Sequence, residues 1–499
     1  MNRRHFCQSS IAAAVAASLS GGQAFASVLQ ALTQVTSNIN AVTGNGGDVV
    51  LEKAAVQELS DSLRGNLLLT GSDAYDKARR VLNPSIDKYP ALVVQPSGVA
   101  DIQNAVTFAR ERELLLAVKC GGHSFSGKST CDGGMQIDLS HVRGARIDPQ
   151  TRTAYVEGGS HLADLDHEAM AQGLVTTAGT VSHTGVGGLT LGGGFGRVGR
   201  RFGLAVDNVK AVDIVTADGQ LRHASAAENP DLYWGVRGGG GNFGVVTSFE
   251  FALHPMQRTI VGGEAVFPIE RMKDVLKLYA EMSANAPDDL YVDYYMFDPP
   301  AADGFVMIHV CYSGPEGKAD SVLAPLKKLG EPLNNTIKAT DYVAIQQSFD
   351  NAEPRTGGDY MKSGFTSEIN ESLINAIADY FEPHPERLSW LFFQHSGGAI
   401  GRIDPDATAF AHRYASHALG AVATWNPGAD PAPHFAYVRQ YWKELEPHTR
   451  GFYTNEVSDE AQTVVNANYQ GNFERLLKVK DEYDPTNLFR LNANIRRAV

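Results

Sequence analysis

The chain has 499 residues, enough for two or three domains, because single hydrophobic cores stop growing near about 300 residues. Its 43% hydrophobic and 20% charged residues allow a large core, which excludes a disordered chain. The formal net charge is −13 and Lys and Arg form no long run, which argues against a nucleic-acid partner.

The first 26 residues have the pattern of an export signal. Arg3 and Arg4 form a twin-arginine pair, an Ala-rich apolar stretch follows over residues 11–19, and Ala24-Phe25-Ala26 offers a small-residue cleavage site. The stretch is too short to span a bilayer, which takes about 20 residues. We therefore predict a twin-arginine signal over residues 1–26, no membrane span, and a periplasmic or secreted protein; the alternative is a frayed N-terminal helix.

Residues 27–50 are polar and end in Gly44-Asn45-Gly46-Gly47, and we interpret them as a linker. From residue 51 to residue 257, strand-like and helical patterns alternate, which predicts a first domain. Its expected elements are a helix over 102–109 with Ser97 as its cap, strands over 114–118, 135–139 and 153–156, a helix over 162–172, and a hairpin at Asp218-Gly219.

Residues 258–452 have fewer glycine clusters and more aromatic residues. Val266-Phe267 is strand-like, apolar residues from Met272 to Tyr279 mark one helix face, and residues 291–297 and 305–312 have the pattern of paired strands. This β-α-β-β order predicts a second domain with an antiparallel sheet, and the whole chain is predicted to be α+β. Residues 453–499 are expected to form a separate C-terminal unit.

The 50 glycines exceed the roughly 35 typical of a chain this long, and they are clustered. The clusters are GGHSFSG at 121–127, a run over 179–199, and GGGGNFG at 238–244. Glycine lets main-chain N–H groups approach an anionic phosphate without a Cβ in the way. Tight turns would explain any one cluster, but three together indicate a large phosphate-bearing ligand held mostly by backbone.

The segment from Gly194 to Gly199 matches the G-x-G-x-x-G dinucleotide fingerprint. That fingerprint is specific only after a buried strand and at the start of a helix. Here the preceding residues 184–193 are glycine-rich rather than strand-like, and Arg200-Arg201 stand where an apolar helix face should begin. We therefore reject a Rossmann site, and the chain also lacks the G-x-x-x-x-G-K-[ST] loop of NTPases.

The cysteines give no metal-binding pattern. Cys7 lies in the predicted signal, which leaves Cys120, Cys131 and Cys311 without any Cys-x-x-Cys pair, so no metal site is predicted. Cys120 and Cys131 bracket the first glycine loop. In an oxidising compartment they could form a disulfide, and spacing alone leaves both the disulfide and the free thiols open.

The glycine-loop motifs carry a resemblance. GGHSFSG at 121–127, AGTVSHTGVGG…LGGGFG at 178–196 and RGGGGNFGVV at 237–246 resemble the FAD-binding domain of berberine bridge enzyme-like oxidases, which belong to the vanillyl-alcohol-oxidase (PCMH-type) superfamily. NYQGNFERL at 468–476 and FRLNANI at 489–495 are similar to the closing segment of that family. The resemblance implies a two-part PCMH-type FAD-binding domain and an α/β substrate domain with an antiparallel sheet.

The resemblance also implies how the flavin is held. The histidine of the GGHS loop, here His123, would bond covalently to FAD, whereas an isolated histidine in a glycine loop is more often a local hydrogen-bonding group. The position of the second linking cysteine found in many relatives is Val181 here, so a single covalent link is expected. The other expected cofactor-binding residues are Gly121, Gly122, Ser124, Ser126, Gly127, Gly179, Thr180, His183, Thr184, Gly187, Gly188, Val246, Asn492 and Asn494.

The implied chemistry is a two-electron oxidation of a small-molecule substrate, in which a base takes a proton while the flavin accepts a hydride and then reduces O2 or an electron carrier. The family's base is a tyrosine of the closing segment, here Tyr469, although packing against the flavin domain would equally explain that residue. Gln394 and His395, in a strand-like run, are candidate pocket residues, although a solvated or hydrogen-bonded position in the sheet is the favoured alternative for both. Tyr453 is a further candidate for the pocket. Oxidation of CH–OH groups is favoured, with CH–N oxidation or a flavin dehydrogenase as alternatives.

Overall fold

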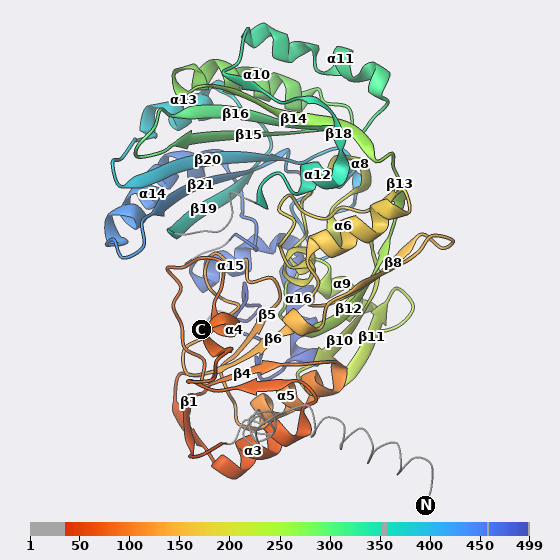
Figure 1. The fold of residues 1–499 in the computed structure, drawn as a ribbon, viewed down its shortest axis with the longest axis vertical. Helices are drawn as coiled ribbons and strands as arrows, with labels where there is room; N and C mark the ends of the chain where they lie inside the picture. The colour runs from red at the N-terminus through yellow and green to blue at the C-terminus, as the bar shows by residue number, and fades with distance from the viewer. Residues whose placement is uncertain (1–34, 351–356, 457–458, 498–499) are drawn as a thin grey trace, which may run out of the picture.

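The computed structural model describes residues 35–350, 357–456 and 459–497, so the predicted export signal lies outside the described residues. Two smaller sheets and their helices form the lower half of the molecule, and one large sheet with helices on its outer face forms the upper half (Figure 1). The predicted α+β class is confirmed. No helix among the described residues is long and apolar enough to cross a membrane.

The described chain begins with a hairpin where a linker was expected. Strands β1 (Ile39–Val42) and β2 (Asp48–Leu51) pair antiparallel, and Gly46 in their turn has a φ of +83°. Arg490 near the C-terminus donates a hydrogen bond to the Gly44 carbonyl (2.6 Å). The linker prediction is therefore wrong for residues 39–50, because a glycine-rich run serves a tight turn as readily as a tether.

The first small sheet is mixed. Its strand order is β3-β4-β6-β5, with β6 parallel to both β4 and β5 and with helices α3 and α5 packed on it. The N-cap of α5 is Gly98 rather than the predicted Ser97, and the Asp101 carboxylate accepts a hydrogen bond from the Ser97 N–H (2.8 Å). The elements of this part are β3 (Asn66–Leu68), β4 (Leu92–Gln95), β5 (Leu116–Lys119), β6 (Met135–Asp138), α3 (Lys53–Ser62), α4 (Tyr75–Arg79) and α5 (Val99–Glu111).

The second small sheet is antiparallel throughout, in the order β11-β10-β12-β8-β7. Its β10–β11 pair confirms the hairpin predicted at Asp218-Gly219. The elements are β7 (Ala145–Asp148), β8 (Thr153–Glu157), β10 (Val209–Thr216), β11 (Leu221–Ser225), β12 (Gly244–Ala252), α6 (Leu162–Ala171), α7 (Val186–Leu191), α8 (Gly199–Phe202), α9 (Pro230–Val236) and the short pair β9 (Leu174–Val175) and β13 (His254–Pro255).

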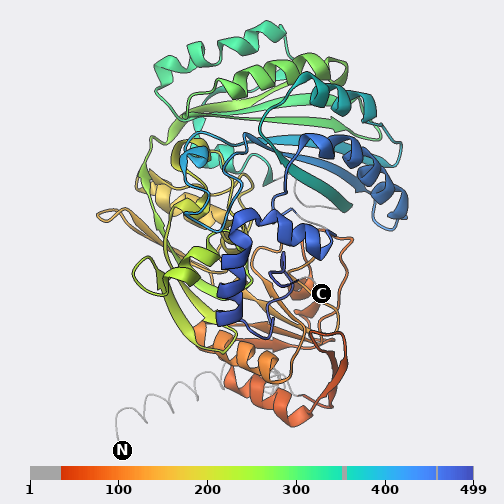
Figure 2. The same ribbon diagram turned by 180° about the vertical axis from the view of Figure 1, so that it is seen from behind.

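The large sheet belongs to the predicted second domain. All its strand pairs are antiparallel, in the order β17-β14-β16-β15-β20-β21-β19 with β18 also pairing with β14, and the β-α-β-β start is confirmed. Helices α10, α13 and α14 bury its outer face (Figures 1 and 2). The elements are β14 (Thr259–Pro268), β15 (Leu290–Asp298), β16 (Phe305–Tyr312), β17 (Asn334–Asn335), β18 (Lys338–Asp341), β19 (Gly358–Thr366), β20 (Arg387–His395), β21 (His417–Trp425), α10 (Met272–Ala284), α11 (Ala319–Val322), α12 (Tyr342–Gln346), α13 (Glu371–Tyr380) and α14 (Ala432–Leu445).

The C-terminal segment returns to the lower half, where α15 (Gln462–Asn468) and α16 (Phe473–Tyr483) lie against the second small sheet (Figure 2). Its attachment is polar as well as apolar. The buried Lys480 ammonium donates to the Asn242 carbonyl and to the Asp484 carboxylate, at 2.7 Å each. The segment therefore joins the core beneath the third glycine cluster.

Buried arginines connect the two halves. Arg200, at the start of α8, is 6% exposed and donates to the carbonyl oxygens of Leu290 (3.0 Å), Ala286 (2.9 Å) and Ser396. Arg413 pairs with Asp207 through two hydrogen bonds of 2.7 and 2.8 Å. Arg200, which argued against a Rossmann helix in the sequence, thus binds backbone carbonyl groups of the upper half.

Replacing Arg200 with Met should destabilise the protein by about 3 kcal/mol, because three carbonyl oxygens would lose their donor in a buried place. The expected result is a lower midpoint in urea unfolding. Arg402→Met is the matched control: Arg402 is 61% exposed in its ion pair with Asp288, and its loss should leave the unfolding midpoint nearly unchanged. Equal midpoints for Arg200→Met and the wild type would contradict this assignment.

Candidate functional site

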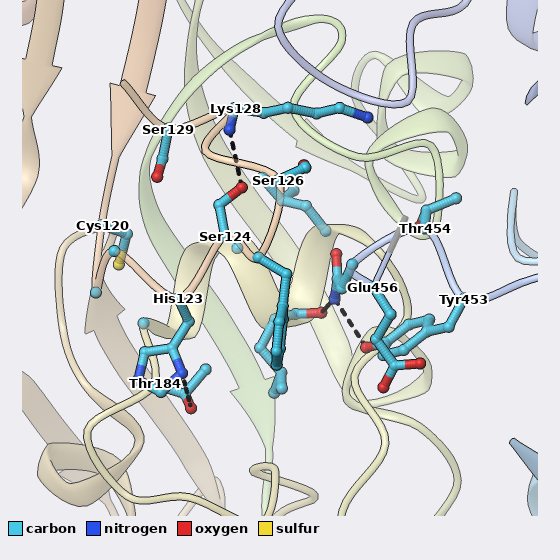
Figure 3. Close-up of a pocket in the computed structure, with 18 of the residues that line it drawn as sticks. Cys120, His123, Ser124, Ser126, Lys128, Ser129, Thr184, Tyr453, Thr454 and Glu456 are labelled. Carbon is cyan, nitrogen blue, oxygen red and sulfur yellow. Dashed lines mark hydrogen bonds between the residues drawn. The ribbon is translucent and has the colours of Figure 1, made fainter. Parts of the chain in front are cut away.

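A cavity of about 610 Å³ lies between the glycine loops of the lower half and the inner face of the large sheet. This volume is in the range of cofactor and substrate sites. Figure 3 shows His123 and Thr184 on one side of the cavity and Tyr453 and Glu456 on the other. All three glycine clusters contribute residues to its lining.

The glycine loops approach each other more closely than side chains would allow. A Cβ on Gly121 would lie 2.3 Å from the Gly185 nitrogen, so the first two loops pack backbone to backbone. A Cβ on Gly188, by contrast, would meet no atom within 4 Å and would project into unfilled space. This backbone-lined cradle fits a dinucleotide, because bare N–H groups can face a diphosphate there.

Most of the residues predicted to bind the cofactor line this cavity. Gly127, His183 and Asn494 do not. Gly127 turns away toward Ile86, and Asn494 lies in the C-terminal segment, where its carbonyl accepts from Gln462 (2.7 Å). The predicted residues that line it are Gly121, Gly122, His123, Ser124, Ser126, Gly179, Thr180, Thr184, Gly187, Gly188, Val246 and Asn492.

His123 has a defined set of neighbours. Its Nε2 lies 2.7 Å from Nδ1 of His183, and its Nδ1 lies 3.3 Å from the Thr184 hydroxyl oxygen. When His183 accepts, the proton of His123 is on Nε2, and Nδ1 is then the nucleophilic nitrogen. His183 therefore contacts His123 and does not line the cavity. From there it can hold the imidazole of His123, the predicted attachment residue, in one orientation.

Val181 lines the cavity at the position where a second linking cysteine was sought. The three cysteines that the structure describes, Cys120, Cys131 and Cys311, form no disulfide. The Cys120 sulfur lies against the Gly158 carbonyl (3.1 Å) and the Cys131 sulfur against that of Met135 (3.6 Å). Of the two alternatives for Cys120 and Cys131, free thiols are therefore the one observed. No cluster of metal-ligating side chains occurs among the described residues.

Alternation along β20 separates two predicted pocket residues. Gln394 lines the cavity, whereas the side chain of His395 points to the opposite face of the sheet, as neighbours in a strand must. There its ring accepts from the Val292 N–H (3.4 Å) and donates to the Ser283 carbonyl (3.1 Å). His395 is therefore wrong as a pocket residue.

Tyr453 lines the cavity as predicted. Its phenol oxygen accepts from the Gly194 N–H (3.0 Å) and from the Asn455 amide (2.8 Å). Its ring packs edge-on against Phe195, with centroids 5.1 Å apart. These contacts tie the second glycine cluster to the C-terminal segment.

Tyr469 does not line the cavity. It is 3% exposed within the core between the second small sheet and the C-terminal segment, and its hydroxyl donates to the Ala493 carbonyl (2.6 Å). Burial also raises its pKa, which makes ionisation harder. The assignment of Tyr469 as the base is therefore wrong, and its role is the packing role considered as the alternative.

Glu456 is the acidic residue that the sequence reasoning missed. It lines the cavity, its buried Oε2 has no hydrogen-bond partner among the residues that the structure describes, and burial raises its pKa to about 7. A carboxylate in this state suits proton transfer near neutral pH. Its position three residues after Tyr453, in the segment already singled out, was the available signal.

The inner face of the large sheet supplies many of the other missed lining residues, and nearby loops supply the rest. Because side chains alternate along a strand, the placement of Gln394 in the pocket could have indicated Phe392 and Trp390 as well. Lys128 also lines the cavity, and burial lowers its pKa to about 8. The remaining missed residues include Phe125, Tyr295, Phe297, Phe349, Asp359, Met361, Leu388 and Thr424.

Comparison with known proteins identifies two families along the chain. Residues 90–225 match the family described as FAD binding domain, and residues 452–496 match the family described as berberine and berberine like. An FAD-linked oxidoreductase of Dictyostelium discoideum is 31% identical over 446 residues, which cover 88% of this chain and 96% of that protein. The (R)-6-hydroxynicotine oxidase of Paenarthrobacter nicotinovorans is 29% identical, with 87% and 97% covered.

Solved structures show the same fold. The 6-hydroxy-D-nicotine oxidase of Arthrobacter nicotinovorans superposes with a TM-score of 0.78 at 26% identity, covering 87% of this chain and 98% of that one. The berberine bridge enzyme-like protein 1 of Physcomitrella patens gives a TM-score of 0.80 at 23% identity, covering 89% and 100%. The chain therefore belongs to the berberine bridge enzyme-like family of FAD-linked oxidoreductases, in the vanillyl-alcohol-oxidase superfamily.

Proposed function

We propose that this oxidoreductase carries FAD bonded to His123 and oxidises a CH–OH group of a small alcohol or sugar, with O2 as the final acceptor. The observation that carries the proposal is the arrangement of the cavity. It places a backbone cradle containing His123 opposite a buried carboxylate, Glu456, with an apolar sheet wall between them. Family membership shows an FAD-linked oxidoreductase. The covalent bond to His123, the CH–OH donor and the O2 acceptor are the parts that we propose.

The cradle residues would hold the cofactor. Gly121, Gly122, Gly187 and Gly188 line the cavity, where their main-chain N–H groups would bind a diphosphate. When bound, the flavin supplies the hydride acceptor and the route of the electrons to O2. His183 would hold the His123 imidazole in one orientation through the 2.7 Å contact.

Glu456 would take the proton from the substrate hydroxyl. Within the described part of the chain its Oε2 accepts no hydrogen bond of normal geometry, although the Ser363 hydroxyl lies near the carboxyl group, so it can accept one from a bound alcohol. With a pKa near 7, a large share of Glu456 is ionised at neutral pH and ready to accept the proton. Tyr453 would contribute by keeping Gly194 and Asn455 in place beside it.

A second candidate is oxidation of a CH–N bond. It is favoured by two carboxylates, Glu456 and Asp359, that line the same cavity and would attract an alkylammonium group. One relative is named (R)-6-hydroxynicotine oxidase and another, 27% identical, xylooligosaccharide oxidase, so relatives of both kinds exist. Slow return of the oxidised flavin spectrum in air would instead indicate a dehydrogenase that uses an electron carrier.

Replacing His123 with Ala should abolish covalent attachment of the flavin, because no other described residue at this loop offers an imidazole to the cavity. The measurement is flavin fluorescence of the protein band in a denaturing gel. His167→Ala, at an exposed position of α6, should keep the fluorescence. A fluorescent His123→Ala band would show that the flavin is attached elsewhere.

Replacing Glu456 with Gln should slow anaerobic flavin reduction by substrate about 10²- to 10⁴-fold, the usual contribution of a general base. Because the carboxyl must be ionised to accept a proton, the wild-type rate should rise with pH through about 7, and the rate of the variant should not. The exposed Glu474→Gln is the control in the same segment. An unchanged rate and pH profile in Glu456→Gln would rule out this role.

We also propose export by the twin-arginine pathway to a periplasmic or secreted location, supported by the residue pattern over 1–26 alone. Mass spectrometry of the mature protein should find Ser27 as the first residue. Replacing Arg3 and Arg4 together with Lys should leave the protein uncleaved inside the cell. A wild-type protein that keeps its first 26 residues would contradict the proposal.

A further inference from the structure

Four aromatic rings on the large sheet form a continuous surface toward the cavity, here called the aromatic platform: Tyr295 and Phe297 of β15, and Trp390 and Phe392 of β20. Tyr295 lies opposite Phe392 in the strand register and Phe297 lies opposite Trp390. All four line the cavity. Cross-strand neighbours on one face bring their side chains into contact, so the platform follows directly from the register.

Three of the four rings lie nearly parallel to one another, and the Phe392 ring is tilted against them. The Tyr295 and Phe297 rings are 5.9 Å apart with 7° between their planes, and the Phe297 and Trp390 rings are 5.8 Å apart with 22°. Phe392 lies 5.7 Å from Trp390 and 6.4 Å from Tyr295, tilted by 33° and 32°. The rings therefore form one contiguous apolar surface toward the cavity.

The neighbouring strand holds the platform rigid. The Trp390 indole N–H donates to the Thr424 hydroxyl (3.2 Å), and that hydroxyl donates in turn to the Asp359 carboxylate. A Cβ on Gly420 would lie 2.3 Å from the Phe392 ring, so only glycine at position 420 leaves room for the ring as it lies. A surface fixed before binding loses little side-chain entropy on binding.

The hydroxyl groups of Tyr295 and Thr424 on this wall are already engaged. The Tyr295 hydroxyl donates to Asp293 (3.3 Å), and the Thr424 hydroxyl is held between Trp390 and Asp359. Phe125 packs against the group that contains Phe392 and Trp390, and the Phe349 ring lies 5.5 Å from that of Tyr295. Gln394 adds an amide to this wall, and Asp359 adds a carboxylate.

We infer that the substrate carries a planar aromatic ring, an aryl-substituted alcohol rather than an oligosaccharide, packed against the aromatic platform. This inference rests on the proposed function and names its substrate class. A buried sugar would leave several hydroxyls without partners on this wall, and each unpaired polar group is costly. An aromatic ring needs no such partners and gains from stacking.

Binding can be tested without any oxidation, using the flavin-loaded enzyme and two neutral amides that cannot be oxidised as alcohols. The probes are 2-naphthamide and decahydro-2-naphthamide, which share a head group and differ in aromaticity. Isothermal titration calorimetry should show the aromatic probe binding about tenfold more tightly. Equal affinities, or tighter binding of the saturated probe or of cellobiose, would overturn the inference.

Two variants assign the effect to the platform. Trp390→Leu should weaken binding of 2-naphthamide about tenfold and that of the saturated probe less than about threefold. Gly420→Ala keeps all four rings and forces Phe392 to tilt, so it should also weaken the aromatic probe selectively. Tyr380→Leu, at a half-exposed tyrosine on the outer helix α13, is the control and should change neither affinity.

The outcomes separate this inference from the proposed function. An enzyme that contains covalent flavin and is reduced by an alcohol, yet binds both probes alike, would overturn the aryl preference alone. An enzyme without covalent flavin that still prefers the aromatic probe would overturn the cofactor attachment and leave the platform intact. If either variant fails to fold, Phe297→Leu tests the same surface, and unchanged selectivity in it would count against the platform.

Discussion

Two buried guanidinium groups fix the distance between the glycine loops and the large sheet that faces them. Arg197, 2% exposed, lies between α7 and α8, and Arg200, 6% exposed, lies at the start of α8. Arg197 donates to the Thr180 carbonyl (2.7 Å) and to the Gln346 side chain (3.0 Å), and the Gln346 amide donates back to the Ala178 carbonyl (3.1 Å). Since Thr180 lines the cavity and Gln346 belongs to the upper half, the width of the cavity depends on these contacts.

These contacts join two halves that contribute different kinds of groups to the site. The lower half contributes backbone, where bare glycine loops and His123 suit a cofactor held mainly by main-chain groups. The upper half contributes side chains on a rigid sheet, and sites on regular elements hold their geometry well. The C-terminal segment contributes Glu456 and Tyr453 between them. A change on the sheet can therefore alter the substrate without disturbing the cradle.

Local sequence pattern was enough for the cradle and for much of the fold. The hairpin at Asp218-Gly219 and the β-α-β-β start of the second domain came from local signals, and most of the expected cofactor residues line one cavity. Long ordered motifs made the family recognisable. The glycine-rich run at 44–47 was misread because a turn and a tether share the same composition.

The residues that were missed or wrongly assigned depend on contacts between segments that lie far apart in the sequence. Tyr469 was chosen by position in a motif, but whether its hydroxyl faces a cavity or the Ala493 carbonyl is decided by the packing of the last segment. Gln394 and His395 are neighbours on a strand, so their side chains must point to opposite faces of the sheet. The sequence does not show which of the two faces lines the cavity. The aromatic platform required the register between β15 and β20, which only the assembled sheet provides.

The most direct measurement is an anaerobic titration of the purified enzyme with a panel of aryl alcohols, sugars and amines, followed by admission of air. The account predicts that an alcohol bleaches the visible flavin absorption band and that air restores it promptly. Bleaching by amines alone, or a folded protein that shows no flavin band at all, would contradict it.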